Sequence, residues 1–224
     1  MRLQMIDALA YRPRYGVTNE SIEAVMGGLQ VSENDRILAI AGSGDQGFAM
    51  LEVTREVVLV DNDERQIDWV RRRAMCLAKG DNVDFLYAPN SIDEWQEICK
   101  PRRDEYFEIP GRLEKIRANL SGLRVKMDDI TICSQNSKPE SFDKIYLSNA
   151  GGDTPRPEFF KKFAHALSPG GLLYHADVGF SRGYIPERTG LILERELTQF
   201  AIAKEIECKK NWFFWKPAVF RKKA

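Results

Sequence analysis

Histidine and cysteine, the side chains that most often hold metals or act as nucleophiles, are scarce in this sequence. Its 224 residues include two histidines and four cysteines, and the cysteines are scattered without any CxxC spacing. This pattern argues against a zinc site and against a disulfide framework, because both need closely spaced or paired ligands. We expect no bound metal, reduced thiols and a cytoplasmic location, with no His or Cys catalytic constellation.

The sequence also lacks a net charge and a long hydrophobic run. Its 33 basic and 33 acidic residues cancel, so electrostatics gives no reason to expect a nucleic-acid partner; the basic C-terminal tail is interpreted as a solvated end. No stretch approaches the roughly 20 apolar residues that span a bilayer, and the N-terminus lacks the apolar run of a signal peptide. The sequence therefore predicts a soluble protein without membrane insertion.

The most informative stretch covers residues 36–61. An apolar run leads to a turn that contains Gly42, Gly44 and Gly47, then to a short helical segment and a second apolar run that ends at Asp61. Continuous apolar runs indicate strands buried on both faces of a parallel sheet. Glycines let the backbone approach a ligand closely, and an acid ending the next strand can accept hydrogen bonds from ribose hydroxyls. The stretch predicts a nucleoside-containing cofactor at the carboxyl ends of the strands.

The rest of the chain alternates between helical and extended patterns. Asn19 is expected to cap a helix with an apolar face from Ile22 to Leu29, and residues 64–79 form a second amphipathic helix. Further helices are expected from Pro157 to a turn at 168–171 and around 186–198. Further strands are expected at 123–127, from 142, at 171–178, near 201–208 and at 213–221. The last two strands are too close for a crossover connection and must be antiparallel.

This order of elements predicts an α/β fold, a Rossmann-like three-layer sandwich whose mostly parallel seven-stranded sheet has an antiparallel last strand. Residues 1–18 are expected to form an N-terminal arm or lid, and residues 19–224 the main domain. Residues 81–122 are interpreted as a helical insertion, with a strand at 82–88, a short helix at 91–99 that Pro101 ends, and a helix at 112–120. Residues 134–141 are expected to form a polar loop.

The spacing of the three glycines also occurs in dinucleotide-binding domains, so other features must select the cofactor. A nicotinamide-dependent enzyme normally needs a further substrate domain, for which these 224 residues leave no room. Acids recur at successive strand ends, where Asp61 would bind a ribose and Asp129, or its neighbour Asp128, would accept from an adenine amino group. These features favour S-adenosylmethionine.

In the order of its elements, the sequence resembles the class I S-adenosylmethionine-dependent methyltransferase fold over residues 19–221. Three stretches are more similar to the betaine-lipid type of 3-amino-3-carboxypropyl transferases: ILAIAGSGDQGFAML (37–51), VDNDERQIDWVRRRAM (60–75) and IYLSN (145–149). Such enzymes transfer the amino-acid arm of the cofactor instead of its methyl group. Asp63 and Glu64 replace the Asn-Pro pair of that branch, and Gly42 replaces its usual serine.

The strand ends and this resemblance together imply a set of site residues. Those expected to contact the cofactor are Ala41, Gly42, Ser43, Gly44, Asp45, Asp61, Asn62, Gln66, Asp129, Ser148 and Asn149. Asn149, at the end of the fourth strand, and Tyr15, in the N-terminal arm, are also expected at the reacting centre. Arg182 is a candidate for holding a substrate carboxylate through a bidentate pair. We expect His165 to be exposed and His175 to be structural.

The sequence therefore predicts an enzyme. A sulfonium activates all three of its carbon substituents toward displacement, so positioning a nucleophile can suffice without a strong base. The preferred interpretation is transfer, or intramolecular displacement, of the 3-amino-3-carboxypropyl group. The alternatives are a methyltransferase that acts on a small molecule and a non-catalytic cofactor-binding module, and a nicotinamide oxidoreductase is least favoured. The expected partner is a small-molecule acceptor or none, and the chain could form a homodimer.

Overall fold

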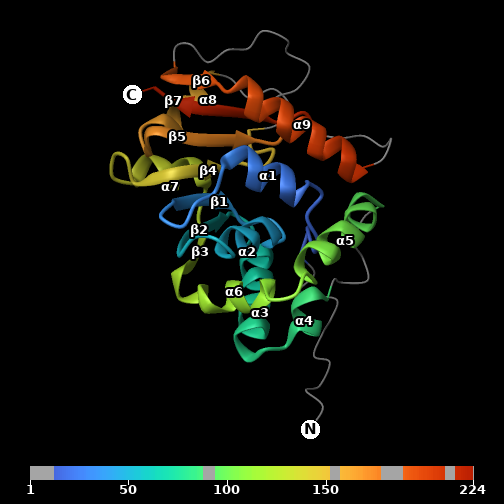
Figure 1. Cartoon of the computed structure of the whole chain (residues 1–224). Coiled ribbons are helices and arrows are strands. Elements are labelled where there is room, and N and C mark those ends of the chain that lie inside the picture. Colours follow the sequence, from blue (N-terminus) through green and yellow to red (C-terminus); the bar gives the residue numbers. More distant parts are fainter. Residues whose placement is uncertain (1–12, 88–93, 152–156, 178–188, 210–214, 224) are drawn as a thin grey trace.

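The computed structural model describes residues 13–87, 94–151, 157–177, 189–209 and 215–223, and its centre is a seven-stranded mixed sheet (Figure 1). The strand order is β3-β2-β1-β4-β5-β7-β6. Strands β1 to β5 are parallel, and β7 is antiparallel to both β5 and β6. The strands are β1 Arg36–Ile40, β2 Glu56–Asp61, β3 Leu123–Met127, β4 Phe142–Tyr146, β5 Leu167–His175, β6 Leu191–Leu193 and β7 Ala218–Lys222. The predicted fold class is confirmed.

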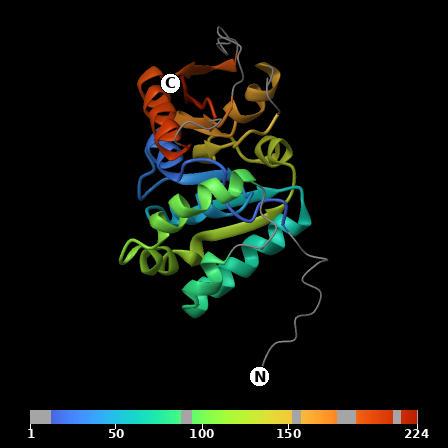
Figure 2. The ribbon, with the colours of Figure 1, turned by 90° about the vertical axis from the view of Figure 1, so that its right-hand side faces the viewer.

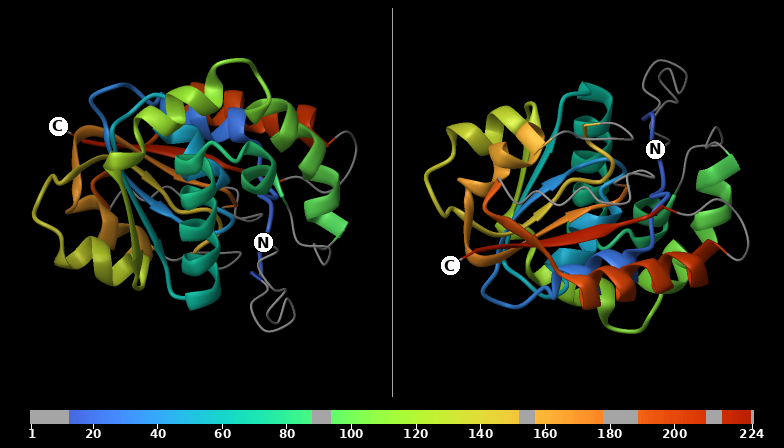
Figure 3. Two further views of the ribbon diagram at one scale, coloured as in Figure 1. Left: turned by 90° about the horizontal axis from the view of Figure 1, so that it is seen from below. Right: turned by 90° about the horizontal axis from the view of Figure 1, so that it is seen from above.

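Helices cover both faces of the sheet, in unequal numbers (Figures 2 and 3). In the described ranges, α1 to α6 and α9 pack on one face, whereas α7 and α8 pack on the other. The helices are α1 Ile22–Leu29, α2 Asp45–Leu51, α3 Glu64–Lys79, α4 Asn82–Leu86, α5 Glu94–Phe107, α6 Arg112–Ala118, α7 Ile130–Asn136, α8 Pro157–Ala164 and α9 Arg195–Lys209, with a 3-10 turn at Leu120–Gly122. None of these helices is long and apolar enough to cross a bilayer.

The central strands are buried on both faces, as their continuous apolar runs predict. In β1, Ile37 and Ala39 pack against the layer that contains α1 and α2, whereas Leu38 packs against the layer that contains α7 and α8. All three side chains are fully buried. Burying a side chain of the size of Ile37 or Leu38 contributes about 1.5–3 kcal/mol, so the two layers hold β1 in the middle of the sheet.

The N-terminal helix begins two residues later than expected. The Oγ atom of Ser21 accepts a hydrogen bond from the N–H of Ala24 at 3.1 Å and caps α1. The carbonyl of Asn19 instead accepts from the indole N–H of Trp215 at 2.9 Å. The prediction that Asn19 is the cap is therefore wrong, although the helix and its buried face from Ile22 to Leu29 are confirmed.

Residues 81–122 form α4, α5, α6 and the 3-10 turn, and two details differ from the prediction. The prediction of a strand at 82–88 is wrong. Residues 82–86 instead form the short helix α4, in which Phe85 is the buried residue. The helix expected to end at Pro101 continues through this proline to Phe107. Pro101 removes one backbone hydrogen bond, but burial of Arg103 and Phe107 in the following turns offsets that loss.

Two further differences flank β4. The polar stretch expected to be a loop from 134 lies within α7 as far as Asn136, because Ile130 and Cys133 bury a helical face against the sheet. Residues 168–171 do not end the preceding helix. They form a bulge inside β5, in which Leu167 pairs with Phe142 and Leu172 pairs with Lys144.

The C-terminal part contains the largest error of the sequence prediction. Residues 201–208 form part of α9 and not a strand, with Ala201, Glu205 and Cys208 buried on one helical face. Besides β5, β7 pairs with β6 at Leu191–Leu193, which lies within the range where a helix was expected. Two antiparallel neighbouring strands are present, as predicted, but a helix rather than a short turn connects them. Residues 186–188 and 213–214 of these predictions lie outside the described residues.

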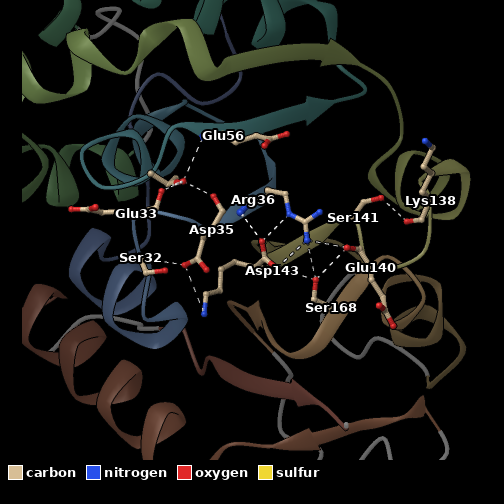
Figure 4. A network of polar contacts seen from close by, with 12 residues as sticks. Ser32, Glu33, Asp35, Arg36, Glu56, Lys138, Glu140, Ser141, Asp143 and Ser168 are labelled. Carbon is tan, nitrogen blue, oxygen red and sulfur yellow. Dashed lines mark hydrogen bonds and ion pairs between the residues drawn. The ribbon is translucent and has the colours of Figure 1, made fainter.

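A polar network closes the amino ends of the central strands (Figure 4). The guanidinium of Arg36 donates to both carboxylate oxygens of Asp143 at 3.0 and 3.1 Å, and the Oγ of Ser168 donates to the same carboxylate at 2.9 Å. These residues come from β1, β4 and β5. Bidentate pairs of this kind fix geometry as well as adding energy. We therefore assign these residues at the amino edge of the sheet a structural role.

Asp45, the first residue of α2, is fully buried and joins four segments. Its Oδ1 lies 2.7 Å from Arg73 of α3 and 3.6 Å from Arg103 of α5. Its Oδ2 accepts from the N–H of Thr18 at 2.7 Å and the hydroxyl of Ser43 at 2.8 Å. Burial raises the pKa of Asp45, but the two guanidinium groups and the Thr18 amide outweigh it and hold this pKa below its usual value.

We predict that Asp45→Asn destabilises the protein by about 3–5 kcal/mol, because it leaves the buried guanidinium of Arg73 without its counter-charge and that of Arg103 with Asp104 as its remaining ion-pair partner. The free energy of unfolding in urea measures this change. The matched control is Asp68→Asn, which removes a carboxylate from an exposed pair with Arg71 and should cost less than about 1 kcal/mol. Equal unfolding free energies for the two variants would show that the buried pair does not hold the fold together.

Candidate functional site

The loops that follow β1, β2 and β4 meet at the carboxyl edge of the sheet. The order in which the chain adds strands reverses between β1 and β4. From β1 the chain adds β2 and β3 on one side, and it then adds β4 and β5 on the other side. Open α/β sheets bind ligands at such a switch point. Two hollows lie here, and Ile40 and Asp61 line both of them.

The first hollow is lined by the residues before α1, the glycine loop after β1 with Gln46 of α2, and the ends of β2 and β4. The predicted site residues that line it are Tyr15, Ala41, Gly42, Ser43, Asp61, Ser148 and Asn149. The structure therefore brings together residues from the segment before α1 and from three strand ends.

Gly42 and Gly44 serve this loop in different ways. Gly42 has φ +48°, and a Cβ atom on it would meet nothing within 4 Å. Its backbone is thus open to a ligand in the first hollow. Gly44 has φ +88°, and a Cβ there would come within 3.0 Å of Phe48 and Val70. Gly44 therefore allows the loop to pack against the core, and it does not line either hollow.

Asp61 forms the wall between the two hollows. Its Oδ2 accepts from the N–H of Gly42 at 3.1 Å, and its Oδ1 accepts from the N–H of Asp63 at 3.0 Å. Burial raises the pKa of Asp61, while these amides act in the opposite direction. A carboxylate offers about four acceptor positions, and the amides of Gly42, Asp63 and Asn62 take three of them, so one position remains for a ligand hydroxyl.

The second hollow lies beside β2 and α7, and the predicted residues Asn62 and Asp129 line it together with Asp128. Asp129 also caps α7, since its Oδ1 accepts from the amides of Thr131 and Ile132 and from the Thr131 hydroxyl. These bonds, the Thr131 hydroxyl foremost, lower the pKa of Asp129. Its Oδ2 receives none of these bonds and is available for a donor on a ligand.

Two of the predicted contact residues, Gln66 and Asp45, stabilise the glycine loop without lining a hollow. Gln66 is buried, and its Nε2 donates to the carbonyl of Gly42 at 2.5 Å and to that of Tyr15 at 3.0 Å. Asp45 is committed to the ion pairs described above. Neither residue lines a hollow, so we assign both a positioning role. Arg182 lies outside the described residues.

Five polar residues of the first hollow were not predicted as site residues: Thr18, Asn19, Glu20, Gln46 and Tyr146. Glu20 is only 2% exposed, and its carboxylate accepts from the hydroxyls of Tyr146 and Ser148. Burial and the neighbouring Glu20 raise the pKa of Tyr146, which keeps its hydroxyl protonated. In the sequence, Glu20 has the position of an ordinary acid near a helix N-terminus, so no local pattern distinguishes it.

The two histidines take no part in this site. His165 is exposed, as expected. His175 is buried in β5, where its Nε2 lies 2.8 Å from the carbonyl oxygen of Ala150. Burial lowers the pKa of His175, which fits the predicted structural role.

No family model matches the chain, and no curated protein is significantly similar to it. Among solved structures, it is similar to the YcgJ protein of Bacillus subtilis, with a TM-score of 0.54 and 11% identity over 91% of this chain and 98% of that chain. A candidate methyltransferase from Bacillus halodurans gives a TM-score of 0.51 and 12% identity, over 91% and 99%. The cyclase SpnF gives 0.50 and 10%, over 91% and 80%. At such identities these likenesses establish a shared architecture, and the chain has the Rossmann-like fold of class I methyltransferases.

Proposed function

We propose that the chain is an S-adenosylmethionine-dependent transferase whose cofactor spans the two hollows. The observation that carries this proposal is their shared wall at Asp61. A ribose on this carboxylate would direct adenine toward Asn62 and Asp129 in the second hollow. The amino-acid arm would then lie over Gly42 in the first hollow, with its sulfonium near the ends of β1 and β4.

The charges on the wall favour this cofactor over a dinucleotide. The first hollow is bordered by the carboxylates of Glu20 and Asp61. A nicotinamide dinucleotide would bring its pyrophosphate to the glycine loop, where the carboxylate of Glu20 would repel it. The sulfonium and ammonium groups of S-adenosylmethionine would instead be attracted.

The finer part of the proposal is that the displaced group is the 3-amino-3-carboxypropyl arm. The sequence stretches at 37–51, 60–75 and 145–149 support it by their resemblance to enzymes that transfer this arm. The likeness to the cyclase SpnF indicates that this architecture is not confined to methyl transfer. Methyl transfer to a small molecule is the second candidate, favoured by the likeness to a candidate methyltransferase.

The chemistry needs positioning above all. Holding a nucleophile in line with a carbon–sulfur bond and excluding water can supply about 7–11 kcal/mol of the barrier. Asn149 and Tyr15 stand at the border of the first hollow and would orient the acceptor. Gln66 would hold Tyr15 in place, because its side chain exchanges two hydrogen bonds of 3.0 Å with the Tyr15 backbone.

We predict that Asp61→Ala weakens S-adenosylmethionine binding by about 1–3 kcal/mol, since it removes a charged acceptor for the ribose hydroxyls. Titration calorimetry with wild type and variant measures the change. The control is Asp84→Ala, which removes an exposed carboxylate of α4 far from either hollow and should leave the affinity unchanged. Equal affinities for Asp61→Ala and the wild type would refute the ribose assignment.

The nucleoside by-product separates the two candidate reactions. We expect that purified protein incubated with S-adenosylmethionine, alone or with cell extract, releases methylthioadenosine, because displacement of the amino-acid arm leaves the methyl group on sulfur. Mass spectrometry of the reaction mixture identifies the product. Release of S-adenosylhomocysteine would establish methyl transfer and overturn the finer proposal.

A further inference from the structure

Glu20 is a buried acid on the wall of the first hollow, and the proposed transfer gives it no part in the chemical step so far. Its Oε2 accepts from the hydroxyl of Tyr146 at 2.7 Å, and its Oε1 accepts from the hydroxyl of Ser148. Burying a carboxylate is costly unless hydrogen bonds compensate it. These hydroxyl donors, one to each oxygen, help to hold the carboxylate in a single orientation beside the cofactor arm.

The chain around Glu20 is anchored from several sides. The amide of Thr18 donates to Asp45 at 2.7 Å, and the amide of Ser21 donates to Glu205 of α9 at 2.7 Å. Gln46 of α2 donates to the carbonyl of Glu20 at 3.4 Å. The position of this acid in the hollow is therefore built by several elements of the fold.

Ser148 adds a second, independent feature. Its φ of +51° lies in the left-handed region, which residues other than glycine adopt uncommonly. Such strain persists where the surroundings enforce it, and it concentrates at functional sites. Here the unusual backbone accompanies the bond that the Ser148 hydroxyl donates to Glu20.

We propose that Glu20 is a catalytic residue that binds the ammonium group of an amine nucleophile and takes its proton. This inference rests on the proposed transferase function and names the chemical class of its nucleophile. A buried carboxylate attracts a primary ammonium group and repels an anionic acceptor such as a carboxylate or phosphate.

The acidity of the nucleophile distinguishes amines from alcohols. An alkylammonium has a pKa near 10, whereas a hydroxyl is about as weak an acid as water, with a pKa near 16. Proton transfer to a carboxylate, which is a weak base, is therefore far less unfavourable from an ammonium group than from a hydroxyl group. The carboxylate also gains its full electrostatic attraction only from the charged ammonium.

The step balances without any further reactant. The ammonium gives one proton to Glu20 and becomes a neutral amine. Its nitrogen lone pair forms a bond to the sulfonium-bound carbon, and the carbon–sulfur bond breaks with its electron pair on sulfur. The products are a substituted ammonium and a neutral thioether, and Glu20 then releases its proton to water.

The ammonium has two possible sources. A separate amine would give a product in which the transferred group is attached to the acceptor nitrogen. The amino group of the cofactor's own arm would attack the carbon next to sulfur, forming a four-membered cyclic amino acid and methylthioadenosine. Both sources share the same chemistry at Glu20.

The test uses the full chain and S-adenosylmethionine labelled with ¹³C in both the methyl group and the amino-acid arm. It is incubated in buffer alone and with a filtered extract of small molecules from cells. Fragmentation mass spectrometry locates the atom that carries the label. We expect a new carbon–nitrogen bond in the labelled product. If the nucleophile is a separate amine, this product forms only when extract is present. If it is the cofactor's own amine, the product forms in buffer as well as with extract.

A label attached through oxygen, sulfur or carbon would overturn the amine inference and leave the transferase proposal intact. Absence of any labelled product would overturn the transferase proposal itself. Glu20→Gln keeps the shape of the side chain and removes its charge, and we expect it to lower product formation about 100-fold or more. The control Glu33→Gln changes an exposed glutamate and should retain wild-type turnover. Wild-type turnover in a folded Glu20→Gln protein would also overturn the inference.

Discussion

The carboxylate of Asp45 is the interaction on which the site depends. It lies at the start of α2 and contacts Arg73, Arg103 and Thr18, so it couples the glycine loop to α3, α5 and the segment before α1. A buried ion pair is weak evidence of stability by itself, but removing one partner is costly because a buried charge remains. The pair therefore fixes relative positions, and it brings Glu20 to the hollow beside the glycine loop.

The two hollows differ in how their walls are made. The second hollow is bordered by the helix cap Asp129, whose bonds to Thr131 and Ile132 would persist without a ligand. The first has Glu20, a carboxylate held by hydroxyl donors and nearly excluded from water. A rigid anion of this kind suits a cationic reacting group, so we assign the chemistry to the first hollow.

Much of the fold follows from the sequence, because the decisive signals are local. The residues from Arg36 to Asp61 are contiguous, and their apolar runs and glycines predict both strands and the loop between them. Glu20 and Tyr146 are 126 positions apart, so only the folded sheet brings them together. The prediction for the segment around Glu205 is wrong for another reason. Its alternating side chains suggest a strand, whereas burial against α1 selects a helix. Tertiary packing overrides such weak local preferences.

A crystal structure of the protein with S-adenosylhomocysteine tests the central claim most directly. The account predicts that the ribose hydroxyls bind the carboxylate of Asp61, with adenine beside Asn62 and the amino-acid arm over Gly42. A ligand bound elsewhere, or one whose ribose does not contact Asp61, would contradict it. So would saturated crystals in which both hollows contain only water.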